Sequence, residues 1–350
     1  MDINLFDYHL PEELIAQFPA RDRDQSKLLI VNRATQQIEQ ADFSQVINYI
    51  NPGDCLIVNN TKVFKARLFG NRVTGAEVEI FLVRRKEKDS LIWEALAQPS
   101  RRLKEGEQIH FHKSCHTDRL SLTLGKYLGD GRWEVIFSSK LSEEKIIDRY
   151  GHVPLPQYIK RPDEPTDINR YQTIFADDLQ QGAVAAPTAG FHFTDTIIEQ
   201  LNQKGVSIGE VTLHVGPGTF KPVTADKIED HIVDPEFAVL PQKTADLINQ
   251  TRANGGKVIA VGTTSTRTLE SADFVDNQNQ PLSRMVDLYI KPGYQFKIVD
   301  RLITNFHLPK SSLLILVSTF AERELILKAY ARAIENKFRF YSYGDAMLIL

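Results

Sequence analysis

Residues 76–85 read AEVEIFLVRR, and in this stretch Val78, Ile80 and Leu82 recur at every second position. A period of two places these side chains on one face of an extended strand. The stretches LIWEALA (91–97) and RWEVIF (132–137) have the same period, and turn residues separate the stretches. We find no helical pattern between residues 65 and 150. Because a closed barrel leaves no strand edge unpaired, this block predicts a small six-stranded β-barrel.

The residues on both sides of this block mix helix and strand patterns. A proline-rich connector, GHVPLPQYIKRPDEP (151–165), excludes a regular helix or a central strand there. The predicted fold class is therefore mixed α/β: a main α/β domain of residues 1–64 plus 151–350, with a β-barrel domain inserted at 65–150. In the main domain we expect helices at 11–17, 43–50, 194–205, 242–254 and 322–337, and strands at 54–58, 206–215 and 257–262.

Composition narrows the class of protein. The chain has 350 residues, 42 Lys and Arg against 45 Asp and Glu, and a formal net charge of −3. This balance argues against a general nucleic-acid coat, but it is compatible with a local basic face. Two cysteines are too few for a disulfide framework, which is typical of a reducing compartment. The first residues lack a signal-peptide pattern and no apolar run reaches about 18 residues, so we expect a soluble cytoplasmic protein.

Four loop segments are rich in small or neutral residues, and three of them contain a histidine. One of them, GAVAAPTAGFHFT (182–194), has no Lys, Arg, Asp or Glu in a chain in which these residues make up 25%. Two of the other three begin at the end of an expected strand, and the last lies just before an expected helix. Carboxyl ends of strands are where α/β sheets bind ligands, so we expect the four loops to share a pocket. The other three segments are TLHVGPGTFKPV (212–223), VGTTSTRTLES (261–271) and TNFHLPKSSL (304–313).

Two further motifs bear on nucleotide binding and metal binding. The chain has no GxxxxGK[ST] sequence, so a P-loop nucleotide site is not expected. IHFHKSCH (109–116) places His110 and His112 on one face of a strand, close in sequence to Cys115 and His116. No second group of ligating residues follows this cluster, so we expect no metal site.

Nine long motifs, in this order along the chain, resemble the S-adenosylmethionine:tRNA ribosyltransferase-isomerase family, the enzymes of queuosine biosynthesis. The resemblance extends from about residue 1 to 350. The motifs are LPEELIAQFPARDRDQSKLL (10–29), GDCLIVNNTKVFKARLFG (53–70), GHVPLPQYIKR (151–161), YQTIFA (171–176), the four loop segments above (the last as LITNFHLPKSSLLILVSTFA, 302–321) and FRFYSYGDAMLIL (338–350).

The resemblance implies a reaction on tRNA. The family transfers the ribosyl part of S-adenosylmethionine to 7-aminomethyl-7-deazaguanine at the wobble position, isomerises it, and releases adenine and methionine. S-adenosylmethionine is then a ribosyl-donor substrate, and no prosthetic group or metal is implied. The partners are this tRNA and S-adenosylmethionine, no membrane is involved, and we expect a monomer. A barrel inserted in a mixed α/β domain also matches the family.

Combined with the loops, the resemblance suggests roles for individual residues. A general base near the sulfonium would start the reaction, and a proton donor would help adenine to leave. The candidates for these roles are His192, His214 and His307, with Glu236 and Asp345 as carboxylate alternatives. The candidates for binding S-adenosylmethionine are Thr188, Gly190, Gly216, Gly218, Thr263, Thr264, Arg267 and Asn305.

Within this set, Thr263, Thr264 and Arg267 are expected to hold the methionine carboxylate, because guanidinium and carboxylate groups match in geometry. The alternative for Arg267 is an ion pair with Glu270 on the surface of a helix. We expect the tRNA phosphates to bind Arg67, Arg101, Arg102, Lys160 and Arg161, unless these are ordinary solvated charges. Tyr158, Tyr171 and Phe175 are either stacking platforms for an unpaired base or core aromatics.

The chain departs from the family pattern at three positions. Asp234 occupies a position where a second histidine is usual, Val286 replaces a common threonine, and Glu322 lies where a glycine is more usual. Two other functions stay open: an S-adenosylmethionine-dependent tRNA methyltransferase and a non-catalytic RNA-binding module. The methyltransferase predicts a glycine-rich loop after an early strand, which the chain lacks, and the binding module predicts no turnover.

Overall fold

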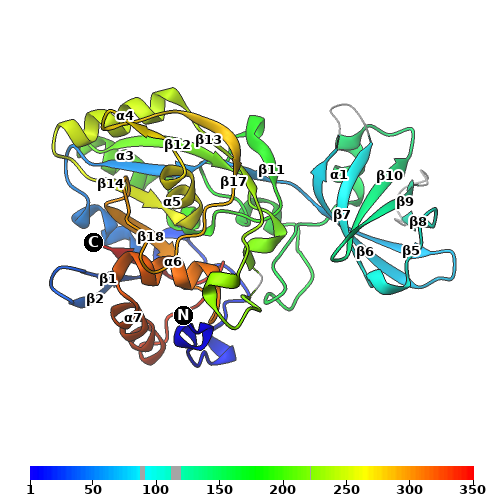
Figure 1. Cartoon of the computed structure of the whole chain (residues 1–350), viewed down its shortest axis with the longest axis horizontal. Helices are drawn as coiled ribbons and strands as arrows, with labels where there is room; N and C mark the ends of the chain where they lie inside the picture. The colour runs from blue at the N-terminus through cyan, green and yellow to red at the C-terminus, as the bar shows by residue number, and fades with distance from the viewer. Residues whose placement is uncertain (87–90, 112–119, 221) are drawn as a thin grey trace. The chain divides into compact units, whose positions relative to one another are not determined.

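The computed structural model describes residues 1–86, 91–111, 120–220 and 222–350, and the chain divides into two compact units (Figure 1). The large unit comprises Met1–Lys62, Pro156–Arg161 and Asn169–Leu350, and the barrel unit comprises Val63–Leu155 and Pro162–Ile168. The boundaries expected from the sequence lie close to this division. That residues 65–150 form a domain of their own stays a prediction.

The large unit is built on a nine-stranded mixed sheet. Its four central strands, β12, β3, β14 and β18, are mutually parallel, whereas β13 runs antiparallel to β12 and β19 antiparallel to β18. The strand order is β17 (Leu282–Val286), β13 (Glu236–Leu240), β12 (Ser207–Leu213), β3 (Cys55–Asn59), β14 (Val258–Val261), β18 (Arg301–Asn305), β19 (Ala346–Ile349), β1 (Lys27–Val31) and β2 (Ile38–Asp42).

These directions bring many chain segments to one edge of the sheet, which we call the site edge. The carboxyl ends of β12, β3, β14 and β18 lie there, together with the amino ends of β13, β19 and β1. The register confirms this, because Asn305 at the end of β18 is opposite Ala346 at the start of β19. The loops singled out in the sequence therefore meet at one edge.

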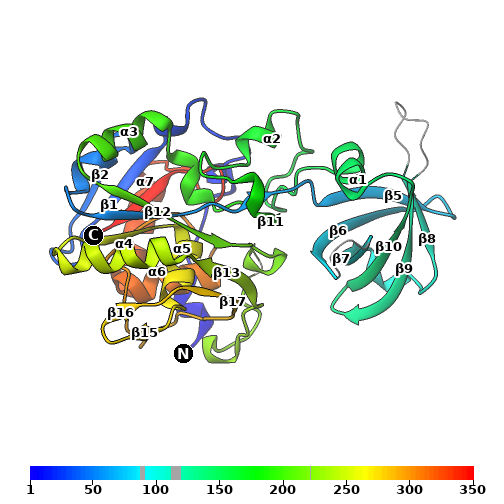
Figure 2. The same cartoon turned by 90° about the horizontal axis from the view of Figure 1, so that it is seen from above.

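Helices cover both faces of this sheet. Alternate strand residues divide between two cores: Ile57 belongs to the core under α4 to α7, whereas Leu56 and Val58 belong to the core under α3. Figure 2 shows α3 and α4 on opposite sides of β12. The helices are α3 (Asp195–Gln203), α4 (Gln242–Ala253), α5 (Gly262–Glu270), α6 (Ser312–Ala321) and α7 (Arg323–Glu335). The mixed α/β class predicted from the sequence is confirmed.

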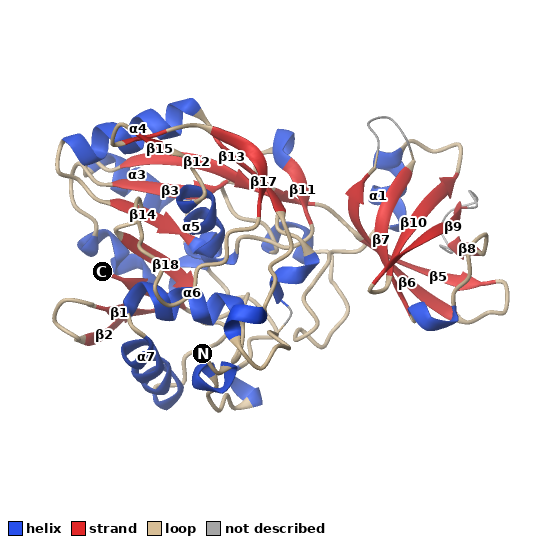
Figure 3. Ribbon diagram, in the orientation of Figure 1, coloured by secondary structure: helices blue, strands red, loops and turns tan. Residues whose placement is uncertain are grey.

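The barrel unit contains a closed antiparallel barrel of six strands, as the alternating pattern predicted (Figure 3). Val78, Ile80 and Leu82 are all buried inside it. A side chain at Gly70 would approach the side chains of Ile109 and Phe111 to 2.8 Å, so glycine is required where this strand packs on residues 109 to 111. The barrel order is β10 (Arg132–Ser138), β7 (Ile92–Gln98), β6 (Glu77–Arg85), β5 (Arg67–Arg72), β8 (Gln108–Phe111) and β9 (Leu120–Gly129).

Three local predictions were wrong. The helices expected at 11–17 and 43–50 are 3-10 turns, and the Asp42 side chain makes no capping hydrogen bond. The segment 65–150, expected to lack helices, ends in α1 (Glu143–Tyr150). The remaining elements are α2 (Asp167–Arg170), β4 (Lys62–Val63), β11 (Gln181–Ala183), β15 (Phe274–Val275), β16 (Gln278–Asn279) and the 3-10 turns η1 (Ile3–Phe6), η2 (Glu12–Leu14), η3 (Arg23–Gln25), η4 (Phe43–Tyr49), η5 (Ser100–Arg102), η6 (Asp178–Gln180), η7 (Thr188–His192), η8 (Pro217–Phe220) and η9 (Ile228–Asp230).

Candidate active site

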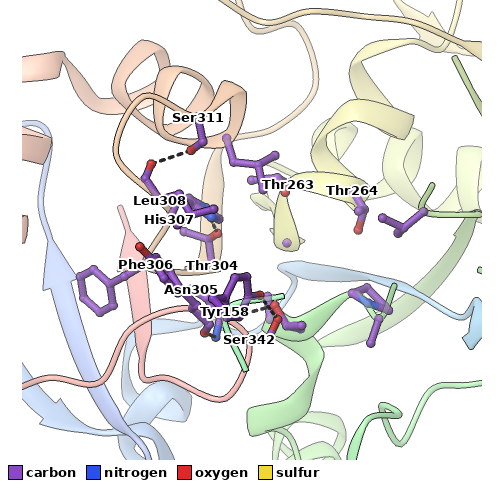
Figure 4. Close-up of a pocket in the computed structure, with 18 residues that line it drawn as sticks. Tyr158, Thr263, Thr264, Thr304, Asn305, Phe306, His307, Leu308, Ser311 and Ser342 are labelled. Atoms are coloured by element: carbon purple, nitrogen blue, oxygen red, sulfur yellow. Dashed lines mark hydrogen bonds between the residues drawn. The ribbon is translucent and has the colours of Figure 1, made fainter. Parts of the chain in front are cut away.

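A pocket opens at the site edge of the large unit, and we call it the substrate pocket (Figure 4). Its wall comes from the β14–α5 junction, the β18–α6 loop, η7, Tyr158 and the segment before β19. None of the described residues in this wall carries a formal charge. The polar side chains in the wall are Tyr158, Thr188, Thr263, Thr264, Thr304, Asn305, His307, Ser311, Tyr341 and Ser342.

Small residues shape this pocket where β14 turns into α5. Gly262 has a φ of 89°, a backbone conformation that costs other residues energy, and it lies against Ala189 of η7. The turn presents the amino end of α5 to the pocket, where unpaired N–H groups favour a negatively charged or polar ligand atom. Thr264 lies in this first turn, and its Oγ1 atom is buried without a hydrogen-bond partner among the described residues.

Among the three candidate histidines, the structure places His307 in the pocket wall. Its Nε2 atom lies 2.9 Å from Thr304 Oγ1 (Figure 4). Its backbone N–H donates to Tyr330 Oη at 3.0 Å, and its carbonyl accepts from the Tyr8 hydroxyl at 2.5 Å. Removal from water lowers the pKa of His307 to about 3. The imidazole is therefore neutral at neutral pH and available to accept a proton.

His192 and His214 lie outside the wall of the substrate pocket. The Nδ1 atom of His192 lies 2.7 Å from Ser26 Oγ, and burial lowers the pKa of His192 to about 3. The Nδ1 atom of His214 lies 2.8 Å from Thr61 Oγ1, and burial lowers its pKa as well. Both rings are held by hydroxyl groups at the site edge, so they support the loops around the pocket.

Arg267 and Glu236 form a buried ion pair beside the substrate pocket. Glu236 also accepts from the Gly216 N–H at 2.8 Å, and Arg267 donates to the Leu288 carbonyl at 3.2 Å. The pair joins α5 to the start of β13, and it leaves Arg267 outside the pocket wall. The alternative partner, Glu270, instead accepts from the N–H groups of residues 297 to 299, so that alternative was wrong.

The remaining candidate residues divide into those that support the fold around the pocket and those that line it. Asp345 pairs with Arg339 at 3.1 Å and accepts from the Lys27 N–H at 3.2 Å, which ties β19 to β1. An added side chain at Gly190 would collide with Thr173 at 2.7 Å, and one at Gly218 with Asp234 at 2.5 Å. Gly190 is therefore required by packing, whereas the atom close to Gly218 is the end of an exposed side chain that can move aside. Thr188, Thr263, Thr264 and Asn305 lie in the pocket wall.

The five candidate tRNA-binding residues differ in whether an ion pair or hydrogen bond within the protein engages their charged groups. Arg101 and Arg102 lie in η5, are exposed, and form no ion pair with the described residues. Arg67 pairs with Glu79 at 2.8 Å, Lys160 pairs with Glu12, and Arg161 donates to the Gln17 carbonyl at 3.0 Å. Binding of tRNA phosphates by these five residues stays a prediction, and among them Arg101 and Arg102 form no ion pair with the described residues.

Some wall residues carried no role in the sequence reasoning. Thr304, Ser311, Tyr341 and Ser342 belong to this group, and Tyr341 and Ser342 lie in the motif FRFYSYGDAMLIL. The Tyr158 hydroxyl lies 2.5 Å from Ser342 Oγ, so this aromatic is part of the pocket.

The other two aromatic candidates and the metal motif can be placed in the same way. Tyr171 packs on Phe191 and Tyr343, and Phe175 packs on Phe193, so both are core aromatics. In the described part of the chain there is no cluster of ligands that could hold a metal ion. His110 lies in β8, whereas His112, Cys115 and His116 fall outside the described residues. No described helix is both long and apolar enough to cross a bilayer.

Comparison with known proteins identifies the class. The model of the queuosine biosynthesis protein family matches residues 3–349. The crystal structure of an S-adenosylmethionine tRNA ribosyltransferase from Thermotoga maritima shares 34% sequence identity, covers 99% of this chain and 100% of its own, and superposes with a TM-score of 0.56. The chain therefore belongs to the queuosine biosynthesis protein family.

Proposed function

We propose that this protein transfers the ribosyl part of S-adenosylmethionine to 7-aminomethyl-7-deazaguanine at the tRNA wobble position and isomerises it, giving epoxyqueuosine-tRNA, adenine and methionine. The proposal rests on the family and on the 34%-identical ribosyltransferase. S-adenosylmethionine is consumed as a substrate, so the reaction needs no resident cofactor. We further propose that the protein acts as a cytoplasmic monomer, which size-exclusion chromatography with light scattering tests for its oligomeric state.

The observation that carries the chemistry is the uncharged pocket with a neutral histidine in its wall. A sulfonium cation there meets hydroxyl groups and the rings of Tyr158 and Tyr341, and no carboxylate neutralises it. The full positive charge then acidifies the adjacent ribose C–H. Proton removal from this carbon is the first demanding step of the reaction, and the neutral imidazole in the wall has the protonation state of a base, although a pKa of about 3 makes it a weak one.

We assign the role of general base to His307. Its proton-accepting form dominates at neutral pH, and Thr304 fixes the orientation of the ring. Thr263 and Thr264, at the amino end of α5, are placed to bind polar atoms of the substrate. His192, His214, Glu236 and Asp345 then act on the loops around the pocket, because each is held by partners outside its wall.

A turnover assay tests this function. Purified protein, S-adenosylmethionine and tRNA bearing 7-aminomethyl-7-deazaguanine are combined, and the products are quantified by mass spectrometry. We expect equal amounts of adenine and methionine, together with tRNA carrying the added ribosyl mass. S-adenosylhomocysteine with a methylated tRNA would identify a methyltransferase instead, and tRNA binding without any product would identify a binding module.

A further inference from the structure

A second cavity lies next to the substrate pocket, and we call it the arginine cavity because Arg23, Arg170 and Arg339 line it. Ser342 lines both spaces. The turn η7 also contributes to both, with Thr188 in the wall of the substrate pocket and His192 in the wall of the arginine cavity. A molecule in the substrate pocket therefore has a positively charged space beside it.

The positive charge of this cavity is not balanced by its surroundings. Arg339 pairs with Asp345 at 3.1 Å. Arg23 and Arg170 donate only to backbone carbonyls, and neither forms an ion pair with the described residues. Burial, and after it the charge of Arg170, lowers the pKa of Arg23. The two guanidinium groups thus repel each other, and a bound anion would relieve this repulsion.

Hydrogen-bond donors are left over in the same place. Of the five N–H donors of a guanidinium group, Arg23 uses three and Arg170 uses two on carbonyls. Arg170 Nε is a donor that is buried without a hydrogen-bond partner in the described part of the chain. Buried donors without partners are costly, and an oxyanion would satisfy several of them at once.

We propose that the arginine cavity binds an oxyanion of a substrate, either the carboxylate of S-adenosylmethionine or a tRNA phosphate, while the reacting part lies in the substrate pocket. This inference rests on the proposed function. The open volume of the arginine cavity, about 280 Å³ including the solvent at its mouth, is less than half the 610 Å³ of the substrate pocket. It therefore suits an anionic group rather than a whole nucleoside. Arg267, the carboxylate partner expected from the sequence, is already paired with Glu236.

The first test compares ligands on the unaltered protein. S-adenosylmethionine and its decarboxylated analogue, which lacks only the carboxylate, are titrated by calorimetry. A charge-assisted contact of about 1.5 to 3 kcal/mol corresponds to a loss of about 10- to 150-fold in affinity for the analogue. If the anion is a phosphate, both ligands bind equally, and inorganic phosphate weakens tRNA binding more than chloride of equal ionic strength does. Equal affinities without a phosphate effect would overturn the proposal.

Substitutions then locate the effect. In Arg23→Gln and Arg170→Gln we expect the difference between the two S-adenosylmethionine ligands to disappear. In the phosphate case, the slope of log affinity for tRNA against log salt becomes shallower by about 0.7 to 0.9 per residue. Arg21→Gln is the matched control, because Arg21 is an exposed neighbour outside the cavity wall. Folded variants that change neither quantity would refute the assignment. A failure of the proposed function looks different, since the unaltered protein would then form no ribosylated tRNA.

Discussion

His307 is the residue whose replacement most directly tests the active site. It is the candidate histidine in the pocket wall, and it is neutral at neutral pH because burial lowers its pKa to about 3. Loss of a general base slows a reaction by about 100- to 10,000-fold, or about 2.7 to 5.5 kcal/mol of activation free energy. We therefore expect His307→Ala to lower kcat by at least about 100-fold, with little change in the affinity for S-adenosylmethionine.

The hydrogen bond to Thr304 provides a graded second variant. Thr304→Val keeps the imidazole but removes the group that orients it at 2.9 Å. A net hydrogen bond is worth about 0.5 to 1.5 kcal/mol, so kcat should fall by about 2- to 12-fold. Because the pKa of His307 is lowered, we expect the acid limb of the pH profile of kcat/KM that reports this residue to lie below pH 5, and not near pH 6.5.

The assay for these variants is single-turnover release of adenine at saturating tRNA, with calorimetric titration of S-adenosylmethionine in parallel. His110→Ala is the matched control, because it also removes an imidazole, but from β8 of the barrel. If His307→Ala retained kcat within tenfold of the original while still binding S-adenosylmethionine, the base would have to be another group.

Three further predictions concern stability and tRNA binding. His192 has a folded pKa of about 3 against about 6.5 unfolded, so the unfolded chain binds more protons between these values and stability is lost as pH falls below 6.5. Its share from pH 7 to 5 is about 2 kcal/mol, and urea unfolding of His192→Asn should show a correspondingly smaller loss. Glu322 has a φ of 67° and a ψ of 134°, a backbone conformation that is strained for any residue except glycine. Glu322→Gly should therefore raise the free energy of unfolding by about 1 kcal/mol, whereas Glu322→Ala keeps the strain and should be less stable than the glycine variant. An alanine variant as stable as the glycine variant would contradict this. In the double variant Arg101→Gln and Arg102→Gln, the slope of log tRNA affinity against log salt should become shallower by about 0.7 to 0.9 for each lost phosphate contact. The kcat at saturating tRNA should not change. An unaltered slope would mean that the tRNA binds elsewhere.

The parts of the fold that the sequence predicted correctly are those with a long, regular period. The alternation of Val78, Ile80 and Leu82 requires a buried strand face, and six such strands have few stable arrangements besides a barrel. The helix Glu143–Tyr150 was missed because eight residues give only two turns of helical period directly after a strand. The turn at residues 43–49 was predicted as a helix because Asp42 is a typical cap, yet no capping bond forms.

The direction of the strands was enough to predict which loops form the site, but it did not predict which side chains pair with each other. Loops after parallel strands must meet at one edge, so a pocket that includes Thr263 and His307 was foreseeable. The partner of Arg267 was not, because Glu236 reaches it only through the order of β12 and β13 in the sheet. A local pattern offers Glu270, three residues along the same helix, but backbone N–H groups occupy that carboxylate.

The C-terminal segment shows why sequence alone does not rank the candidate residues. Because β19 runs antiparallel to β18, the residues just before it return to the site edge and place Tyr341 and Ser342 in the substrate pocket. Ser342 also lines the arginine cavity, so a single antiparallel pairing joins the neutral pocket to the charged one. A neutral space for a reacting cation and a charged space for its anionic part suit a substrate that carries both kinds of group. If the arginine cavity holds the carboxylate of S-adenosylmethionine, as one arm of our proposal has it, that carboxylate is kept away from the sulfonium and does not neutralise its charge.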